Sequence, residues 1–521
     1  MKKAYPQTKK DSTPGSVRLP VQAFAPWSRL TVVDRYAVLD SLNEPSTRFT
    51  LPLTFHEKML LRLSLFAKKF DVLERSSVFR ASTLAPHWNI ILQFLHREGV
   101  VRTPEFSRPL FPNDRPKFPS IMLTEGTGAS TRGGREVSVY GFGAAGTYEE
   151  AISKAIGELL ERFSLAKHDR RAFFSSSIKA LRQKSARFLD PASLPAFADW
   201  QKEAGVNTYT EESKFAWVTA TQVRTGVSVY VPAQLVFWNY DTLAAKEPTL
   251  GYHTTNGGGG FFSREGAYLS AIYETIQRDG FLIYWLNSLS PAVIDVAAAS
   301  SDYPELATML DYLERYHIHP IFLNTTSDLA VPSLICVIVD TNGKEPLITI
   351  GGGTGFDFES MALSALYEAV SVNKSRYGSV PFVLPADYQP FTDKSIKRNE
   401  RLSMWQGKEF VERFNFFITG AKQSVHEFMG EPQMFVGEKE ELAHLVSLLE
   451  GAGYPVYGYE VRDAVVQKLG YHVVKAIIPG LIPLYLQENL ALLGAERLKT
   501  VPEKIGYRSA KELNPWPHPF P

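Results

Sequence analysis

The sequence contains almost no cysteine: Cys336 is the only one among 521 residues. A single thiol excludes intrachain disulfides and any zinc site built from several cysteines. Cys336 lies in the apolar run 334–339, which predicts a buried strand and an inert core thiol, because free cysteine is among the most buried residue types. We therefore expect a protein of the reducing cytoplasm.

An excess of charge, a signal peptide and a membrane span are also missing. The formal net charge of +1 gives no reason to expect nucleic acid or an anionic membrane as a partner. Residues 1–15 contain lysines, but no apolar stretch follows them, so we expect no secretory signal. The longest apolar segment, residues 473–493, is interrupted by prolines and by Gln487 and Glu488, which makes it a poor membrane span.

Common nucleotide-binding motifs are absent from the sequence. It has no Gly-x4-Gly-Lys-Ser/Thr loop and no His-Arg-Asp catalytic loop; the run Lys-His-Asp-Arg at residues 167–170 is only superficially similar. A nucleotide site in this chain must therefore be of another kind.

One pattern occurs three times, and each copy ends in a glutamate. The copies span residues 141–158, 257–274 and 351–368. In each copy, two glycines, a first glutamate and an alanine stand at the same distances before the final glutamate. The copies lie farther apart than the roughly 20–50 residues of stacked repeats. We therefore expect one supersecondary unit used three times around a shared site.

Each copy predicts a helix that carries the final glutamate. In the first copy, Thr147 is a suitable N-cap, and an apolar stripe runs to about Phe163. For a single copy, an ion pair between Glu158 and Arg162 on a solvated face would be a sufficient explanation, and it would stabilise the helix by only a few tenths of a kcal/mol. Three copies in one register favour convergent carboxylates that hold magnesium, with phosphates bound by glycine-loop N–H groups and by arginines.

The order of the expected elements predicts a mixed α/β (α+β) fold. Strands at residues 227–231, 335–339 and 347–350 alternate with glycine-rich loops and helices from about residue 116 onward. Helical patterns at 55–70 and 88–98 predict a small, mainly helical module before them. We expect a flexible basic tail (1–24), a docking or recognition module (25–115), an ATP-binding catalytic domain (116–496) and a Pro-rich C-terminal tail (497–521).

The repeated helices resemble those of the YcaO superfamily, whose members bind ATP through Ser-x3-Glu-x2-Glu-Arg patterns. The first helix matches except that lysine replaces serine: Lys154, Glu158, Glu161, Arg162. The second matches except that glutamine replaces the second glutamate: Ser270, Glu274, Gln277, Arg278. The third keeps Glu368 but has Ser371 where the family usually has glutamine, so we expect it to serve mainly as scaffold. The resemblance covers about residues 116–521.

The resemblance implies ATP and Mg²⁺ as cofactors, held by three glycine-loop/helix units. The implied metal ligands are Glu158, Glu161 and Glu274. The implied ATP-binding residues are Lys154, Arg162, Asn256, Ser270, Gln277, Arg278 and Arg376. The implied catalytic residues are Glu158, Arg162 and the terminal Pro521.

The chain ends with alternating prolines at 515, 517, 519 and 521. By composition, such a run is a linker or a ligand for a proline-binding module. It also resembles the C-terminal Pro-x-Pro-x-Pro of the azoline-forming branch of the YcaO superfamily. In that branch a pre-organised polyproline rod would place the Pro521 carboxylate in the active site.

The implied activity is an ATP-dependent cyclodehydratase that forms thiazoline or oxazoline rings from Cys, Ser or Thr in a ribosomally made precursor peptide. The implied partners are that peptide, a ubiquitin-activating-enzyme-like protein that presents its leader, and a flavin-dependent azoline dehydrogenase. Homodimerisation stays open. Two alternatives also stay open: another YcaO modification, such as thioamide or amidine formation, and a non-catalytic ATP-binding or peptide-docking subunit.

Overall fold

The computed structural model describes residues 17–24, 27–33, 36–41, 48–52, 86–103, 116, 118–124, 139–203, 209–251, 254–376, 380–394 and 396–521. The chain forms two compact units. The smaller comprises residues 1–106, 126–128 and 463–471, and the larger comprises 107–125, 129–462 and 472–521. Among the described residues, no helix is long and apolar enough to cross a membrane.

The smaller unit contains an antiparallel sheet whose four strands pair in chain order. Its strands are β1 (Val17–Phe24), β2 (Trp27–Val33), β3 (Tyr36–Ser41) and β4 (Arg48–Pro52). Among the described residues of this unit, two segments are α-helical: α3 (Pro86–Arg97) and α15 (Ala464–Lys468). An ion pair of 3.0 Å between Glu98 and Lys468 joins two distant parts of its sequence.

The content of this unit differs from the sequence prediction in two respects. Strand β1 occupies the end of the expected flexible tail 1–24, and a sheet stands where we expected mainly helix. The alternation of Val17, Leu19 and Val21 with other residues is the strand signal, and the basic composition around it obscured that signal. The helix expected near residues 88–98 is confirmed by α3, whereas the pattern at 55–70 lies outside the described residues.

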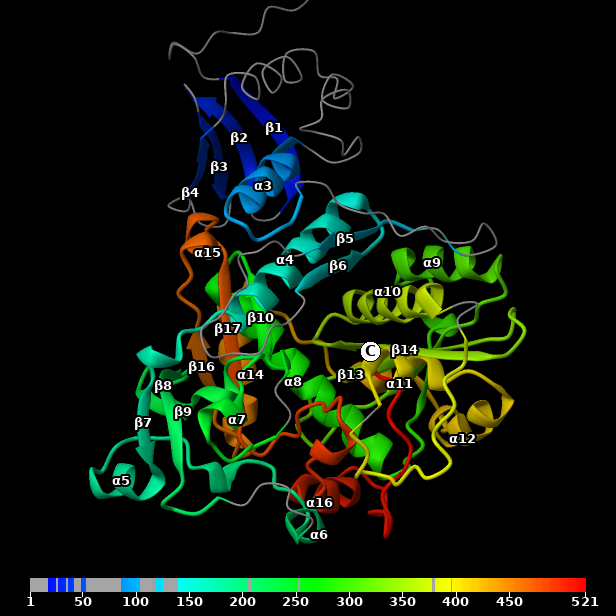
Figure 1. Ribbon diagram of the computed structural model, residues 1–521. Coiled ribbons are helices and arrows are strands. Elements are labelled where there is room, and N and C mark those ends of the chain that lie inside the picture. The colour runs from blue at the N-terminus through cyan, green and yellow to red at the C-terminus, as the bar shows by residue number, and fades with distance from the viewer. Residues whose placement is uncertain are drawn as a thin grey trace, which may run out of the picture. The chain divides into compact units, whose positions relative to one another are not determined.

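The larger unit is built on three sheets (Figure 1). One has the order β10-β17-β16-β8-β7, with β9 also paired to β8; a second has the order β14-β13-β12-β11-β15; the third is the pair β5-β6. Their strands are β5 (Ser120–Thr124), β6 (Tyr140–Ala144), β7 (Phe174–Ser177), β8 (Lys214–Gln222), β9 (Ser228–Pro232), β10 (Gly258–Phe261), β11 (Val293–Asp295), β12 (Ile321–Asn324), β13 (Ser333–Asp340), β14 (Leu347–Thr354), β15 (Lys422–Ser424), β16 (Tyr457–Glu460) and β17 (His472–Ile477).

Helices cover these sheets and fill the connections between their strands (Figure 1). They are α4 (Tyr148–Ala166), α5 (Ile178–Gln183), α6 (Asp199–Glu203), α7 (Thr242–Ala245), α8 (Arg264–Leu286), α9 (Pro304–Glu314), α10 (Phe358–Arg376), α11 (Arg398–Met404), α12 (Lys408–Ile418), α13 (Val425–Met429), α14 (Glu438–Gly451) and α16 (Glu496–Lys504). Cys336 lies fully buried in β13, as expected, and burial raises the pKa of its thiol.

The start of the C-terminal tail is also more ordered than we expected. We placed an irregular tail at residues 497–521, but helix α16 occupies residues 496–504. Pro502, inside its last turn, hid the helical pattern in the sequence. Arg497 in this helix pairs with the fully buried Asp279 of α8 at 2.6 Å, which fixes α16 on the core.

The repeated pattern folds into a strand followed by a helix, three times: β6 with α4, β10 with α8, and β14 with α10 (Figure 1). Most of its glycines therefore lie inside strands rather than in loops. A Cβ on the second glycine of each copy would approach a carbonyl oxygen of its own helix to 1.9, 2.2 or 2.3 Å: Gly143, Gly259 and Gly353 against Ala151, Ala267 and Met361. Glycine is thus required because each helix lies directly on its strand.

We expect Gly353→Ala to lower the free energy of unfolding by about 2 kcal/mol or more, because the new methyl group must push α10 off β14. Urea denaturation followed by tryptophan fluorescence measures the change. Gly451→Ala is the matched control, since nothing lies within 4 Å of a Cβ at that position. Equal stability of Gly353→Ala and the wild type would contradict the helix-on-strand explanation.

Candidate active site

The final glutamate of each copy turns back toward the strand that precedes its helix. Glu158 accepts a hydrogen bond from the Phe142 backbone N–H at 2.5 Å. Glu274 accepts one from Gly257 at 2.7 Å, and Glu368 accepts one from Gly352 at 2.8 Å. We expected these N–H groups to face phosphates, but in each copy one of them binds the glutamate instead. This bond fixes the direction in which each carboxylate points.

The carboxylates of the three copies lie close enough to influence one another. Burial, together with the negative charges of Glu274 and Glu158, raises the pKa of Glu161 to about 8 against the opposing charge of Arg162. Burial also raises the pKa values of Glu158 and Glu368, each with a smaller contribution from Glu274. The expectation of one shared site is therefore met, because charges from all three units act on each other.

Two adjoining cavities open beside these glutamates. The first, which we call the acidic cavity, has a volume of about 450 Å³, and its described lining includes four carboxylates and no lysine or arginine. The second, which we call the basic cavity, has a volume of about 620 Å³ and is lined by three cations, Lys154, Arg376 and Arg398. Ser364 lines both cavities. The site thus has one compartment lined by carboxylates without a lysine or arginine and one that also contains cations.

The structure divides the predicted site residues between these compartments. The acidic cavity is lined by Glu161, Ser270, Glu274 and Gln277. The basic cavity is lined by Lys154, Glu158, Arg376 and Pro521. It is also lined by Glu368, so the third copy contributes a carboxylate to the site and is more than the scaffold that we expected.

The remaining predicted residues contact the glutamates directly. Arg162 pairs with Glu158 at 2.6 Å, and its guanidinium lies 4.6 Å from the centre of the Tyr140 ring. Arg278 lies 3.6 Å from Glu274, and Asn256 donates from its amide to the same carboxylate at 3.3 Å. Each of the two arginines therefore lies beside the final glutamate of its own helix.

The structure shows the contacts of three residues that depart from the family pattern. Lys154 donates to the Ala144 carbonyl at 3.4 Å, and burial lowers the pKa of its ammonium group. Gln277 lies against Gly352, where a Cβ would come within 2.6 Å of its carboxamide carbon. In the third copy, Ser371 donates to the Tyr367 carbonyl of its own helix at 2.6 Å. Each substitute is thus held by close contacts.

Aromatic side chains of the core hold the C-terminal tail in place. The Trp285 indole donates to the Trp516 carbonyl at 3.1 Å, and the Trp405 indole donates to the Pro517 carbonyl at 3.0 Å. Phe520 is fully buried, and the Arg278 guanidinium lies 3.7 Å from the centre of its ring. The tail is therefore anchored at residues 516, 517 and 520, and the last residue, Pro521, reaches the basic cavity.

Sequence reasoning missed two cations of the site. Arg398, at the start of α11, donates to the Tyr140 hydroxyl, and its charge lowers the pKa values of Glu158 and Glu368 against the effect of burial. Lys475, in β17, is buried behind Glu161 and Glu274. Neither residue belongs to the repeated pattern, and no local signal in the sequence distinguishes them from other basic residues.

The residues assigned to magnesium suit that ion chemically. Glu158, Glu161 and Glu274 are hard oxygen donors whose mutual repulsion a cation would relieve. Among the residues that the structure describes, no three acidic, histidine or cysteine side chains form a ready-made metal site. Magnesium commonly completes its coordination with water and phosphate oxygens, so fewer protein ligands suffice. The individual ligand assignments stay predictions.

Solved structures with a similar fold are heterocyclases and a YcaO protein. A heterocyclase in complex with substrate and cofactor is 17% identical, with a TM-score of 0.64 over 82% of this chain and 57% of its own. The heterocyclase TruD is 19% identical, with a TM-score of 0.53 over 71% of this chain and 50% of its own. This chain thus spans little more than half the length of these two proteins.

The YcaO protein from Methanopyrus kandleri, bound with AMPPCP and Mg²⁺, is 16% identical, with a TM-score of 0.52 over 75% of this chain and 90% of its own. These likenesses confirm the mixed α/β fold. A search of curated proteins found no match. The family model of the YcaO cyclodehydratase, which binds ATP and Mg²⁺, matches residues 142–482, well over half of the chain. The chain therefore belongs to the YcaO family, with ATP and Mg²⁺ as its cofactors.

Proposed function

We propose that this protein is an ATP-dependent cyclodehydratase that forms thiazoline or oxazoline rings in a ribosomally made precursor peptide. The observation that carries this proposal is the position of Pro521 in the basic cavity beside Glu158. Family membership makes the chain a YcaO-type enzyme. The anchored proline tail distinguishes the azoline-forming reaction from the family's other backbone modifications.

In the proposed reaction, a Cys, Ser or Thr side chain of the peptide attacks the carbonyl carbon of the preceding residue. This attack closes the ring, and the thiol or hydroxyl loses its proton. The former carbonyl oxygen then accepts a phosphoryl group from ATP, and the C=N double bond forms when this oxygen leaves as phosphate and the amide nitrogen loses its proton. The net change in the peptide is the loss of one water per ring. Phosphoryl transfer of this kind depends mainly on positioning and charge stabilisation.

The two cavities support a division of tasks. We place the metal-bound nucleotide at the boundary of the acidic cavity, with Glu158, Glu161 and Glu274 toward Mg²⁺, which supplies charge neutralisation to the phosphates. Ser270, Gln277 and Asn256 would hold the nucleotide from the second unit. Arg162 and Arg278 would exchange their glutamate partners for phosphate oxygens, to which guanidinium groups bind strongly.

The basic cavity would receive the reacting peptide segment. Its three cations, Lys154, Arg376 and Arg398, can stabilise the negative charge that develops on the oxygen of the attacked amide. The carboxylate of Pro521 would accept the proton that the peptide loses, since a fixed carboxylate can act as a general base. Its position depends on the anchored tail, so the base does not need to be ordered during each turnover.

A separate protein would bring the precursor to this site. We propose a ubiquitin-activating-enzyme-like partner that binds the leader peptide, with the smaller unit as its docking module. A flavin-dependent dehydrogenase would oxidise the azolines afterwards. The reaction is tested by incubating the protein with this partner, ATP, Mg²⁺ and a Cys/Ser/Thr-rich precursor encoded near its gene. Loss of water from the peptide by mass spectrometry, together with phosphate release, is the expected result, and an unchanged peptide mass contradicts it.

Two other functions make different predictions in the same experiment. Thioamide or amidine formation would require a sulfide source or an amine and would give a different mass change. A non-catalytic ATP-binding or docking subunit would stimulate a second YcaO protein and show no turnover alone. Neither alternative explains why the last residue of the chain reaches the cavity beside Glu158.

We expect Glu158→Gln to reduce ring formation by about 100-fold or more, because the variant loses a charge that both Arg162 and the metal require. Phosphate release coupled to peptide modification measures the effect. The control is Glu265→Gln, which alters the first-turn glutamate of the second copy, a residue outside the lining of both cavities. Full activity of Glu158→Gln would instead favour the non-catalytic subunit.

Deletion of Pro521 should lower kcat for ring formation by about 100-fold while the affinity for ATP stays within about twofold of the wild type. The terminal carboxylate would then withdraw from the basic cavity by one residue. Pro521→Ala retains a carboxylate at the same chain position and should keep most of the activity. If both variants behave alike, the carboxylate of the last residue has no role in the reaction.

A further inference from the structure

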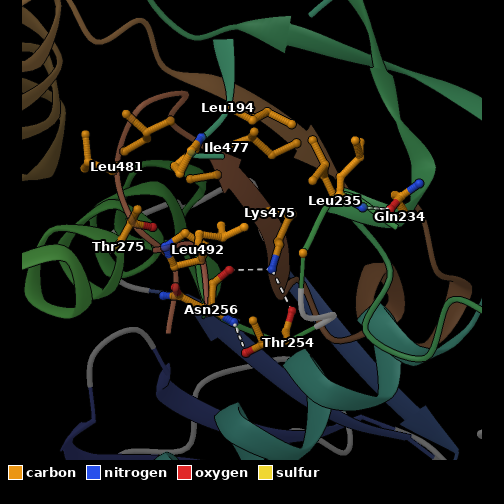
Figure 2. A pocket seen from close by; sticks show the side chains of 16 residues that line it. Leu194, Gln234, Leu235, Thr254, Asn256, Thr275, Lys475, Ile477, Leu481 and Leu492 are labelled. Atoms are coloured by element: carbon orange, nitrogen blue, oxygen red, sulfur yellow. Dashed lines mark hydrogen bonds between the residues drawn. The ribbon is translucent and has the colours of Figure 1, made fainter. Parts of the chain in front are cut away.

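Lys475 is a buried lysine that the proposed reaction does not use. Its side chain extends from the middle of β17 and is only 4% exposed. The ammonium group donates to the Thr254 carbonyl at 2.9 Å and to the Asn256 carbonyl (Figure 2). A buried charge without such partners would be strongly destabilising, so these bonds are the means by which the lysine is kept here.

The backbone that Lys475 holds is the turn at residues 254–257. Two groups of this turn donate to the same oxygen, Oε2, of Glu274: the Gly257 N–H at 2.7 Å and the Asn256 amide at 3.3 Å. The Asn256 side chain is fixed in turn by the Leu484 N–H, which donates to its Oδ1 at 3.1 Å. Lys475, the turn and Glu274 therefore form one connected series of hydrogen bonds.

Strand β10, which pairs with β17, has a glycine opposite Lys475. This residue is Gly258. A Cβ at Gly258 would lie 2.6 Å from Oε1 of Glu161 and 2.7 Å from the Thr255 carbonyl oxygen. Because residue 258 has no side chain, Glu161 can approach this strand, and the turn at 254–257 can lie close to Lys475.

Lys475 also supplies positive charge behind an acidic wall. Burial lowers the pKa of its ammonium group to about 8, although the nearby Glu274 and Glu161 oppose that shift. These two glutamates line the acidic cavity, whose described lining contains no lysine or arginine. The lysine itself lines a different, mostly apolar cavity of about 90 Å³, together with Thr254 and Asn256 of the turn (Figure 2). It therefore acts on the acidic cavity from behind and does not occupy it.

We propose that Lys475 is a positioning residue for nucleotide binding. By fixing the turn at 254–257, it holds Oε2 of Glu274 through two N–H bonds and leaves Oε1 directed to the metal-bound nucleotide. Arg278, at 3.6 Å from that Oε1, is the group that the nucleotide would displace. This inference rests on the proposed function, because it assumes that Glu274 faces Mg²⁺ and ATP.

Titration calorimetry of the full chain with Mg²⁺ and the non-hydrolysable analogue AMPPCP tests the inference. Lys475→Met should raise the Kd for Mg·AMPPCP by about tenfold or more, because Glu274 loses its fixed orientation. The KM for ATP should rise to a similar extent, while the KM for the precursor peptide stays within about twofold, since the peptide contacts other residues. Lys422→Met, in the exposed start of β15, is the matched control and should change neither value.

A double-mutant comparison separates positioning from a general structural role. Asn256→Ala removes part of the turn through which Lys475 acts, so adding Lys475→Met to it should raise Kd by less than about threefold. If Lys475 only stabilises the fold, its replacement by methionine would lower the melting temperature and leave the Kd for Mg·AMPPCP unchanged. If Lys475→Met does not fold, Lys475→Gln keeps an uncharged amide group that can donate to the carbonyls, and it should raise Kd in the same direction.

The outcomes distinguish this inference from the proposed function. A Kd for the Lys475 variants within about twofold of the wild type overturns the positioning role and leaves the cyclodehydratase proposal intact. Absence of Mg·AMPPCP binding to the wild-type protein overturns both. Tight binding by the wild type without any peptide modification overturns the cyclodehydratase proposal alone, because the lysine would still position a nucleotide site.

Discussion

The site depends on one recurring interaction, the hydrogen bond from a backbone N–H near each glycine strand to the glutamate on the helix that follows it. This bond can form only where helix and strand lie almost in contact, which the glycines at 143, 259 and 353 allow. A carboxylate held by its own supersecondary unit keeps its direction without help from a ligand. Three such units therefore present three pre-oriented carboxylates, which is the form of preorganisation that electrostatic catalysis requires.

Pre-oriented carboxylates that share one site repel each other, and the surrounding residues offset this repulsion. Arg162 and Arg278 each lie one helical turn beyond a glutamate, while Arg398 and Lys475 approach from other elements. Arg162 and Arg278 contact the carboxylates that ligands would use. Lys475 instead donates to backbone carbonyls, and Arg398 donates to the Tyr140 hydroxyl. The cations that contact the carboxylates directly and those that are bound elsewhere are therefore different residues.

The parts of the site that the sequence predicted are those set by local spacing. The glycine, alanine and glutamate offsets fix where each helix meets its strand, so Glu158, Glu274 and Glu368 could be found from the register alone. Gln277 and Lys154 could be identified for the same reason. Arg398 and Lys475 could not, because their roles arise from contacts between distant segments. The strands around the glycines and the sheet of the smaller unit were missed since glycine and basic residues are weak strand signals.

The three copies are unequal, and their differences follow the electrostatics of the two cavities. Gln277 takes the place of a glutamate in the acidic cavity, which lowers the repulsion around Glu161 and Glu274. Lys154 adds a cation to the basic cavity, where Glu158 and Glu368 face the end of the chain. Both changes make the site less negative, and the Pro521 terminus adds a carboxylate to the basic cavity. Lys154 thus adds positive charge to the cavity in which two buried glutamates and the terminal carboxylate add negative charge.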